Sequence, residues 1–260
     1  MANEYWQDRM ARSQTRLSDK SRKQIEKQLV KYYKQTATTV MTAFEDTLDK
    51  LRAAVRDGKE PTPADLYKLD KYWKMQAQLR DELQKLGDKE IKLLSQAFET
   101  NFFEIYYSLN LPESVEFHTI NTEMAQQIIN QIWVADGKSW SQRIWEDTQL
   151  LAEQLNEQLI YTVVAGKPTS DLKKLLQERF NVSFSRADAL VRTELAHIQT
   201  QAAKQRYQDY GIQMVEVWAD ADERRCEHCG KLHKTRYPVG AAVPVPAHPR
   251  CRCCILPVVE

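Results

Sequence analysis

The sequence predicts a mainly α-helical protein with a small α+β region at its carboxy terminus. Apolar residues recur at intervals of three and four through most of residues 18–211, as on one face of a helix. Residues 213–218 change to alternating apolar and polar side chains, as in a strand, and all 5 cysteines follow them. A hydrophobic fraction of 42% allows a buried core, and 28% charged residues indicate a soluble chain.

The first predicted element is a long amphipathic helix over residues 18–57. Its apolar face comprises Ile25, Leu29, Tyr33, Ala37, Val40, Phe44, Leu48, Leu51 and Val55. It should end at Asp57-Gly58. Because this helix is longer than those that follow, we expect part of its apolar face to lack a partner within the monomer and to dock on another protein.

Two further helices are predicted before residue 112. Thr62-Pro63-Ala64-Asp65 provides an N-cap, a proline at the first helical position and a capping acid for a helix that should end at Gly87. A third helix should run from Ile91 to Leu109. Helices joined by short loops normally bury their apolar faces together, so an antiparallel bundle is favoured over two partner-binding faces.

The chain after an extended link at residues 112–120 is predicted to be helical again, in four segments. The segments run from Asn121 through Trp133 to a turn at Asp136-Gly137, from Ser139 to Gly166, from Ser170 through Phe180, and from Ser185 to Gly211. We therefore expect an amino-terminal helical bundle and docking module over residues 1–120, a second helical part over 121–212, and a strand with a small knot over 213–260.

Cysteine and histidine residues form two compact clusters near the carboxy terminus. The first is Cys226-Glu-His-Cys229, and the second is His248-Pro-Arg-Cys251-Arg-Cys253-Cys254. Two short segments that each turn soft ligands toward one point are typical of a tetrahedral zinc site. In a reducing compartment an odd number of cysteines confined to one segment also favours a metal over disulfides.

Five candidate ligands compete for four positions around the ion: Cys226, Cys229, His248, Cys251 and Cys253. We expect Cys226 and Cys229 to bind the ion together with His248 and Cys251, because the spacing of His248 and Cys251 repeats that of the first cluster. Cys253 is the alternative ligand, since it would point to the same side as Cys251 in an extended segment. A closed set of four ligands indicates a structural Zn²⁺ rather than a catalytic one. His228 and His233 are expected to face solvent, and Cys254 to be a small buried thiol.

Three polar residues on the helix after Ser185 invite a functional interpretation. Arg192 and Glu194 do not share a helix face, so each should find a separate partner and a structural role. His197 lies three residues after Glu194, but a single Glu-x-x-His pair is a weak metal motif, and a hydrogen-bonded structural histidine is favoured.

Motifs of common enzymes are absent from the sequence. It contains no Gly-rich phosphate loop, Gly-x-Ser-x-Gly turn, His-Glu-x-x-His pair or His-x-Glu of the zinc deaminases. The amino terminus does not resemble a signal peptide, and no apolar run approaches the ~20 residues that span a bilayer. We therefore expect a protein without enzymatic activity, made in a cytoplasm and not placed in a membrane.

Several groups of residues resemble the phage head morphogenesis family, the minor head proteins that include phage Mu F-like members. They are Trp218, Asp222, Arg225-Cys226, Cys229, Leu232, Pro246, His248-Pro249 and Cys251-Arg-Cys253, with Trp140-Ser-Gln-Arg143, Arg192-Thr193-Glu194, Tyr207, Gly211 and the opening Tyr5-Trp6 with Arg9. The resemblance implies a structural minor head protein of a tailed phage. It also implies association with the portal and other capsid or scaffold proteins, action in head morphogenesis and genome packaging or delivery, and a location inside the head after synthesis in the bacterial host cytoplasm.

A second interpretation is a zinc-dependent nuclease or nucleic-acid-binding module. The formal net charge is only +1, but basic residues surround the cysteine clusters: Arg224, Arg225, Lys231, Lys234, Arg236, Arg250 and Arg252. Such local charge gives salt-dependent affinity for phosphates. Nonspecific contact with packaged DNA is therefore also compatible with this charge distribution in a head protein.

Overall fold

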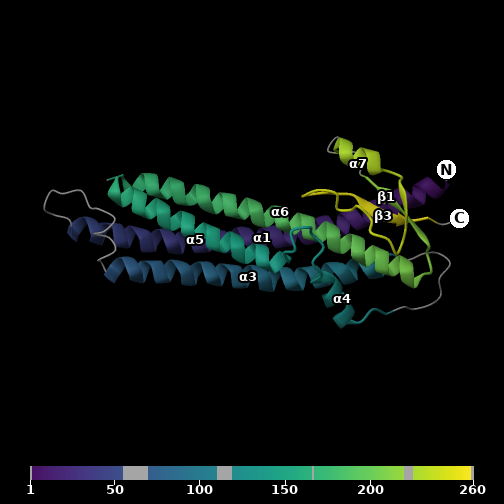
Figure 1. The fold of residues 1–260 in the computed structure, drawn as a ribbon, viewed down its shortest axis with the longest axis horizontal. Coiled ribbons are helices and arrows are strands. Elements are labelled where there is room, and N and C mark those ends of the chain that lie inside the picture. The colour runs from purple at the N-terminus through teal and green to yellow at the C-terminus, as the bar shows by residue number, and fades with distance from the viewer. Residues whose placement is uncertain (1, 55–69, 110–118, 166, 220–224, 259–260) are drawn as a thin grey trace. The chain divides into compact units, whose positions relative to one another are not determined.

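The computed structural model describes residues 2–54, 70–109, 119–165, 167–219 and 225–258 (Figure 1). Helices dominate, and three short strands lie near the carboxy terminus, so the predicted fold class is confirmed. The elements are α1 (Ala2–Ala54), α3 (Asp70–Ser108), α4 (Thr122–Ile129), α5 (Trp140–Val164), α6 (Thr169–Asp209), β1 (Met214–Trp218), α7 (Glu227–Leu232), β2 (Arg236–Pro238) and β3 (Cys254–Pro257). The predicted stop at 57–58 and the cap at 62–65 lie outside the described residues.

The chain forms two compact units, each built from segments far apart in the sequence. The first unit contains residues 1–26, 93–140 and 188–260, and the second contains residues 27–92 and 141–187. The long helices α1, α3 and α6 each contribute residues to both units. The boundaries predicted after residues 120 and 212 follow the order of the sequence and stay predictions.

The second unit is a bundle of segments of α1, α3, α5 and α6. The Tyr33 hydroxyl of α1 lies 3.2 Å from the Ser183 hydroxyl of α6, and the Tyr72 hydroxyl of α3 donates to the Asn156 side chain of α5 at 2.9 Å. In this unit Lys89 lies over the Tyr32 ring, whereas the later residues of α1 share a small cavity with the earlier residues of α3. Helices α1 and α3 are therefore antiparallel. The predicted antiparallel packing of the helix ending at Gly87 on the helix from Ile91 to Leu109 is wrong, because residues 70–108 of these two segments belong to the single helix α3.

The described part of the apolar face of α1 is buried within the chain, whereas Leu51 and Val55 lie outside the described side chains. Six of its predicted members are between 0% and 6% exposed, namely Ile25, Leu29, Tyr33, Val40, Phe44 and Leu48. The expectation that part of this face lacks an internal partner is therefore wrong for the described residues. The physical reason is that α6 returns to α1 and contacts it at Tyr33 and Glu45, which helix length alone does not reveal.

Gly87 does not end a helix, contrary to the prediction, because α3 continues from Asp70 to Ser108. A Cβ atom at Gly87 would lie 2.7 Å from the Trp145 ring of α5. The missing side chain thus makes room for an indole on the neighbouring helix, and glycine serves packing here rather than termination.

Two other helix boundaries also differ from the predictions. α6 is continuous where a break was expected between Phe180 and Ser185. Ser183 is buried and hydrogen-bonds Asp147, so this polar stretch of α6 contacts α5 rather than capping a helix. α1 begins at Ala2, well before residue 18, and α4 ends at Ile129, before Trp133.

The first unit contains a three-stranded antiparallel sheet with the order β2-β1-β3. The strand predicted over residues 213–218 is confirmed as its central strand. Ala11 of α1 packs with Cys254 and Leu256 of β3 in a small buried core, and the Gln14 side chain donates to the Ile255 carbonyl oxygen at 3.2 Å. The early turns of α1 therefore cover the sheet, which Figure 1 shows near the two chain ends.

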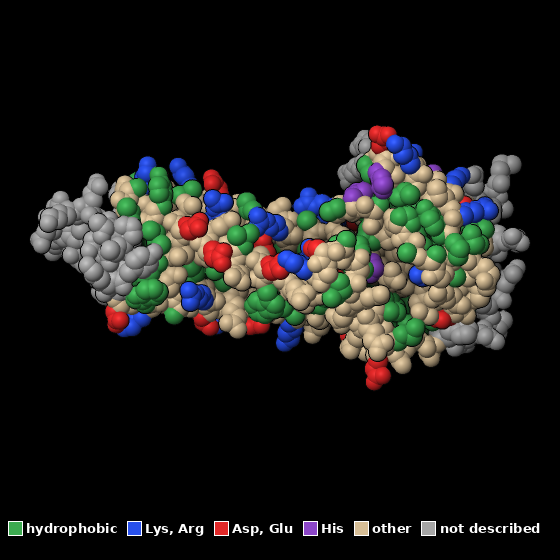
Figure 2. Space-filling view, in the orientation of Figure 1, with side chains coloured by type: hydrophobic (Ala, Val, Ile, Leu, Met, Phe, Trp, Pro, Cys, Tyr) green, Lys and Arg blue, Asp and Glu red, His purple; other side chains and the backbone are tan. Residues whose placement is uncertain are grey.

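Lys and Arg side chains alternate with Asp and Glu side chains along the helices on the face that Figure 2 draws.

No helix in the described parts of the chain combines the length and the apolar character that a membrane crossing requires.

Candidate metal centre

The first knuckle, residues 226–229, is held by the start of α7. Cys226 is the N-cap residue of α7 and has an extended backbone, and its Sγ accepts a hydrogen bond from the Cys229 N–H at 3.3 Å. This hydrogen bond stabilises the thiolate and lowers the pKa of Cys226. The turn leaves Cys226 exposed and Cys229 buried, with both sulfurs on one side.

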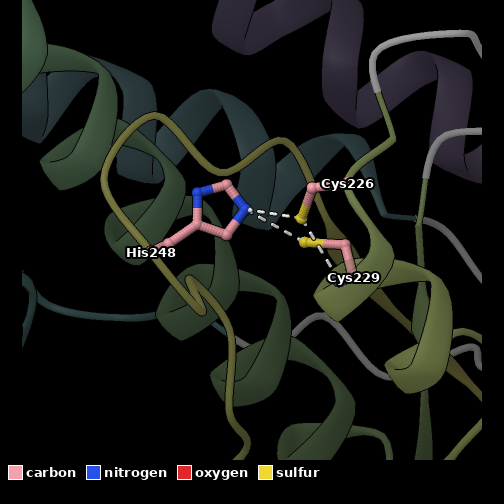
Figure 3. A group of neighbouring side chains, drawn as sticks. All are labelled: Cys226, Cys229 and His248. Carbon is pink, nitrogen blue, oxygen red and sulfur yellow. Dashed lines mark hydrogen bonds between the residues drawn. The ribbon is translucent and has the colours of Figure 1, made fainter.

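His248 points its ring at both sulfurs of the first knuckle, as Figure 3 shows. Its Nε2 lies 3.3 Å from Cys226 Sγ and 3.1 Å from Cys229 Sγ. Its Nδ1 lies 2.9 Å from the Pro249 carbonyl oxygen, which can only accept, so Nδ1 carries a proton. In the neutral ring the Nε2 lone pair then faces the sulfurs, which is the arrangement of a metal-binding histidine.

The second knuckle, residues 248–253, turns back toward the first. The Cys251 N–H donates to the His248 carbonyl oxygen at 3.1 Å, and Arg250 adopts a left-handed backbone with φ of 62°. The Arg250 N–H donates to Thr193 Oγ1 of α6 at 3.1 Å, which anchors the turn. As a result, Cys251 Sγ lies 3.8 Å from Cys229 Sγ.

All five predicted ligands are brought together in two overlapping groups. Cys226, Cys229 and His248 form one, Cys229, Cys251 and Cys253 form the other, and the ligand atoms within each group lie within 4.8 Å of one another. With Zn–S bonds of about 2.3 Å and Zn–N bonds of about 2.0 Å, a tetrahedron places two sulfurs ~3.8 Å apart and sulfur and nitrogen ~3.6 Å apart. The donor types and distances therefore fit zinc.

The buried sulfurs differ in their affinity for protons. A hydrogen bond from Cys253 lowers the pKa of Cys251 to about 5, whereas burial raises the pKa of Cys229 to about 12. A thiolate therefore lies beside protonated thiols in one cluster. A divalent cation that binds there displaces the remaining protons, so its affinity rises with pH.

The residues next to the cluster match the predictions in part. His228 is exposed and Cys254 is buried, as expected. His233 is half-buried, because its Nδ1 accepts from the Ala219 N–H at 3.2 Å and its ring meets the Trp218 ring edge-on at 4.9 Å. The pKa of His233 is lowered, first by burial and then by nearby basic side chains. This histidine supports the sheet.

Arg192 and Glu194 have separate partners, as predicted. Arg192 pairs with Asp188 at 2.9 Å on its own helix, and the buried Glu194 accepts a hydrogen bond from Trp133 Nε1 at 3.0 Å. Nothing in the sequence spacing identifies Trp133 as this partner, since 61 residues separate the two.

His197 stacks on the Trp133 ring with a centroid distance of 4.3 Å. Its buried Nε2 has no hydrogen-bond partner among the described residues, so the prediction of a hydrogen-bonded histidine is wrong for this atom. Burial lowers the pKa of His197 to about 4. The aromatic stack, rather than a hydrogen bond, therefore holds this ring.

A comparison with protein families matches residues 153–256 to the family described as Phage Mu protein F like protein. The resemblance inferred from the sequence is thereby confirmed over this range, which includes α6, both knuckles and all but the last residue of the sheet. Comparisons with curated proteins and with solved structures gave no match.

Proposed function

We propose that this chain is a structural minor head protein of a tailed phage that acts in head morphogenesis. The observation that carries the proposal is the family match, because it covers both cysteine clusters and all but the last residue of the sheet. The chain offers long helices and a ligand cluster whose five side chains exceed the four positions of a zinc ion. These features suit assembly better than catalysis.

Zinc is the metal that we propose for the cluster, with Cys226, Cys229, His248 and Cys251 as ligands. His248 contacts both sulfurs of the first knuckle, and Cys251 lies one tetrahedral edge from Cys229. Cys253 is the alternative fourth ligand, since its sulfur lies within 4.8 Å of the sulfurs of Cys229 and Cys251. The ion would join α7 to the turn before β3 and so hold two distant parts of the sheet region together.

The partners that we propose are the portal protein and other capsid or scaffold proteins, with the docking surface in residues 1–120. The buried face of α1 is not available for this role. Exposed aromatic side chains are available in the same range: Tyr5, Trp6 and Trp73 are 64%, 51% and 53% exposed. Exposed aromatic residues of this kind dominate the binding energy of many protein interfaces.

Quantification of the protein in purified heads tests this function. We expect a few copies in each head, and we expect none when the reading frame is deleted, together with fewer DNA-filled heads. A Trp6→Ala/Trp73→Ala variant should remain folded and be depleted from heads, and Tyr161→Ala, another exposed aromatic residue, serves as the control. Absence of the parent protein from purified heads would refute the proposal.

A further inference from the structure

The early turns of α1 and the second knuckle border a basic cleft of about 690 Å³ in the first unit. Its lining comprises five cationic side chains and one carboxylate, with two uncharged polar side chains: Arg12, Arg16, Lys20, Lys23, Arg252, Asp19, Thr15 and Gln24. All five cationic residues are exposed. We call this site the α1 cleft.

Carboxylates nearby offset only part of this positive charge. Arg12 pairs with Asp8 at 2.6 Å, and Lys20 pairs with Glu104 at 3.0 Å. Arg16 and Lys23 form no ion pair with any described residue. The α1 cleft therefore keeps excess positive charge that a polyanion could neutralise.

An adjoining cleft of about 330 Å³ differs in its charge balance. It shares Thr15, Asp19 and Arg252 with the α1 cleft, and it adds Arg192 of α6, Arg250 of the second knuckle and Arg22 of α1. Arg22 pairs with Glu26 at 2.7 Å. Asp188 lies 2.9 Å from Arg192 and 3.6 Å from Arg250, so these two cations are already compensated. The net positive charge is concentrated on the α1 side.

We propose that the α1 cleft binds the phosphate backbone of duplex DNA. Arg12, Arg16 and Lys20 recur every four residues, which places them on one helix face about 6 Å apart along the axis. A row of cations at this spacing complements the regular line of phosphates on one strand. The Thr15 hydroxyl and the Gln24 amide add hydrogen-bond donors of the kind that contact phosphate oxygens.

The lining residues favour a duplex over a single strand. Single-strand sites combine basic residues with aromatic side chains on which bases stack. Among the described residues that line the two clefts, none is aromatic. Contact limited to the backbone, without base stacking, therefore fits duplex DNA.

The basic residues that surround the cysteine clusters in the sequence differ in whether a carboxylate neutralises them. Lys231 pairs with Glu227 at 2.8 Å and Arg236 pairs with Glu216 at 3.3 Å, so these two residues near the cysteine clusters are compensated. Arg252 instead lines the α1 cleft, and it lies between the candidate ligands Cys251 and Cys253. The second knuckle thus positions one side of the DNA site.

Binding of the full-length protein to a 30-base-pair duplex tests the inference, with fluorescence anisotropy measured between 50 and 200 mM salt. The parent should lose affinity steeply as salt rises. Replacing two uncompensated cations in Arg16→Gln/Lys23→Gln should reduce the slope of log affinity against log salt by about two, since each phosphate that the protein neutralises contributes ~0.9 to that slope. This inference does not rest on the head-protein proposal, and its failure would leave incorporation into heads unchanged.

Lys27→Gln/Lys31→Gln provides the matched control, because both residues are exposed on α1, lie outside the cleft and change the net charge equally. The control should keep the parental slope, and circular dichroism should show both variants folded. Equal slopes for the cleft variant and the parent would overturn the inference. Competition by polyglutamate as effective as by the duplex would assign the cleft to an acidic protein, and equal affinity for single-stranded DNA would exclude the duplex preference.

Discussion

Glu90 is the buried residue whose charge state should most strongly affect stability. It is 3% exposed, and burial raises its pKa from 4.5 to about 8, with a smaller contribution from Asp147 and an opposing hydrogen bond from Tyr33. The folded chain therefore holds a proton that the unfolded chain releases between these two pH values. The contribution of Glu90 to the free energy of unfolding should therefore be fully present below pH 4.5. It should fall by roughly 4 kcal/mol as the pH rises to about 8.

Glu90→Gln should remove most of this pH dependence, because the amide stays neutral. Urea unfolding at pH 5 and pH 8.5 measures the effect as a difference in the free energy of unfolding. Asp88→Asn, an exposed change on the same helix, should leave the parental dependence in place. Equal pH dependence in the parent and in Glu90→Gln would show that Glu90 is not the responsible group.

Single residues were predictable where local spacing determines their neighbours. Cys226 and Cys229 lie on one turn, so their spacing alone brings their sulfurs together. The second cluster could be predicted to join them because both clusters have the ligand types and short spacings of one zinc site. The hydrogen bond between Trp133 and Glu194 does not follow, because it depends on where α4 and α6 lie in the fold. His233 shows the same limit, since its place beside Trp218 depends on strand pairing.

At the scale of the elements, burial separates two aromatic residues that the sequence pattern treats alike. Phe44 of α1 is 1% exposed, whereas Trp73 of α3 is 53% exposed. Phe44→Ala should destabilise the chain by about 3–5 kcal/mol through the cavity that it leaves. Trp73→Ala should change stability by only about 0.5 kcal/mol. Chemical denaturation compares the two, and similar losses of stability would contradict this account of the bundle.

Helix existence was more predictable than helix limits. The apolar periodicity locates each helix, but polar and glycine residues at Gly87 and Ser183 resemble ends when read locally. Their actual roles lie on neighbouring helices, where an indole fills the space at Gly87 and Asp147 hydrogen-bonds Ser183. The strand over residues 214–218 was predictable from the alternation of its residues, although its polar residue Glu216 is also buried and pairs with Arg236.

At the scale of the whole molecule, the sequence predicts successive parts, whereas the contacts define two units of interleaved segments. Long helices cause this difference, because α1, α3 and α6 each have residues in both units. Periodicity identifies a helix face that must be buried, but it does not identify the distant helix that buries it. The arrangement of the units is therefore the least predictable level of the fold.

We expect one structural zinc ion to hold the two knuckles together. A structural zinc ion contributes on the order of 10 kcal/mol of apparent binding free energy, far more than a short proline-rich segment gains from its own core. Without the ion, the region from α7 to β3 should therefore unfold, while the long helices α1, α3, α5 and α6 remain folded.

Elemental analysis of protein purified without added metal tests this claim most directly. We expect one zinc per chain for the parent and for Cys254→Ala, whose thiol lies in the small buried core beside the sheet. We expect none for Cys226→Ser/Cys229→Ser, whose carboxy-terminal region should also become sensitive to protease. A parent protein without zinc, or a double variant that keeps its zinc, would contradict the account.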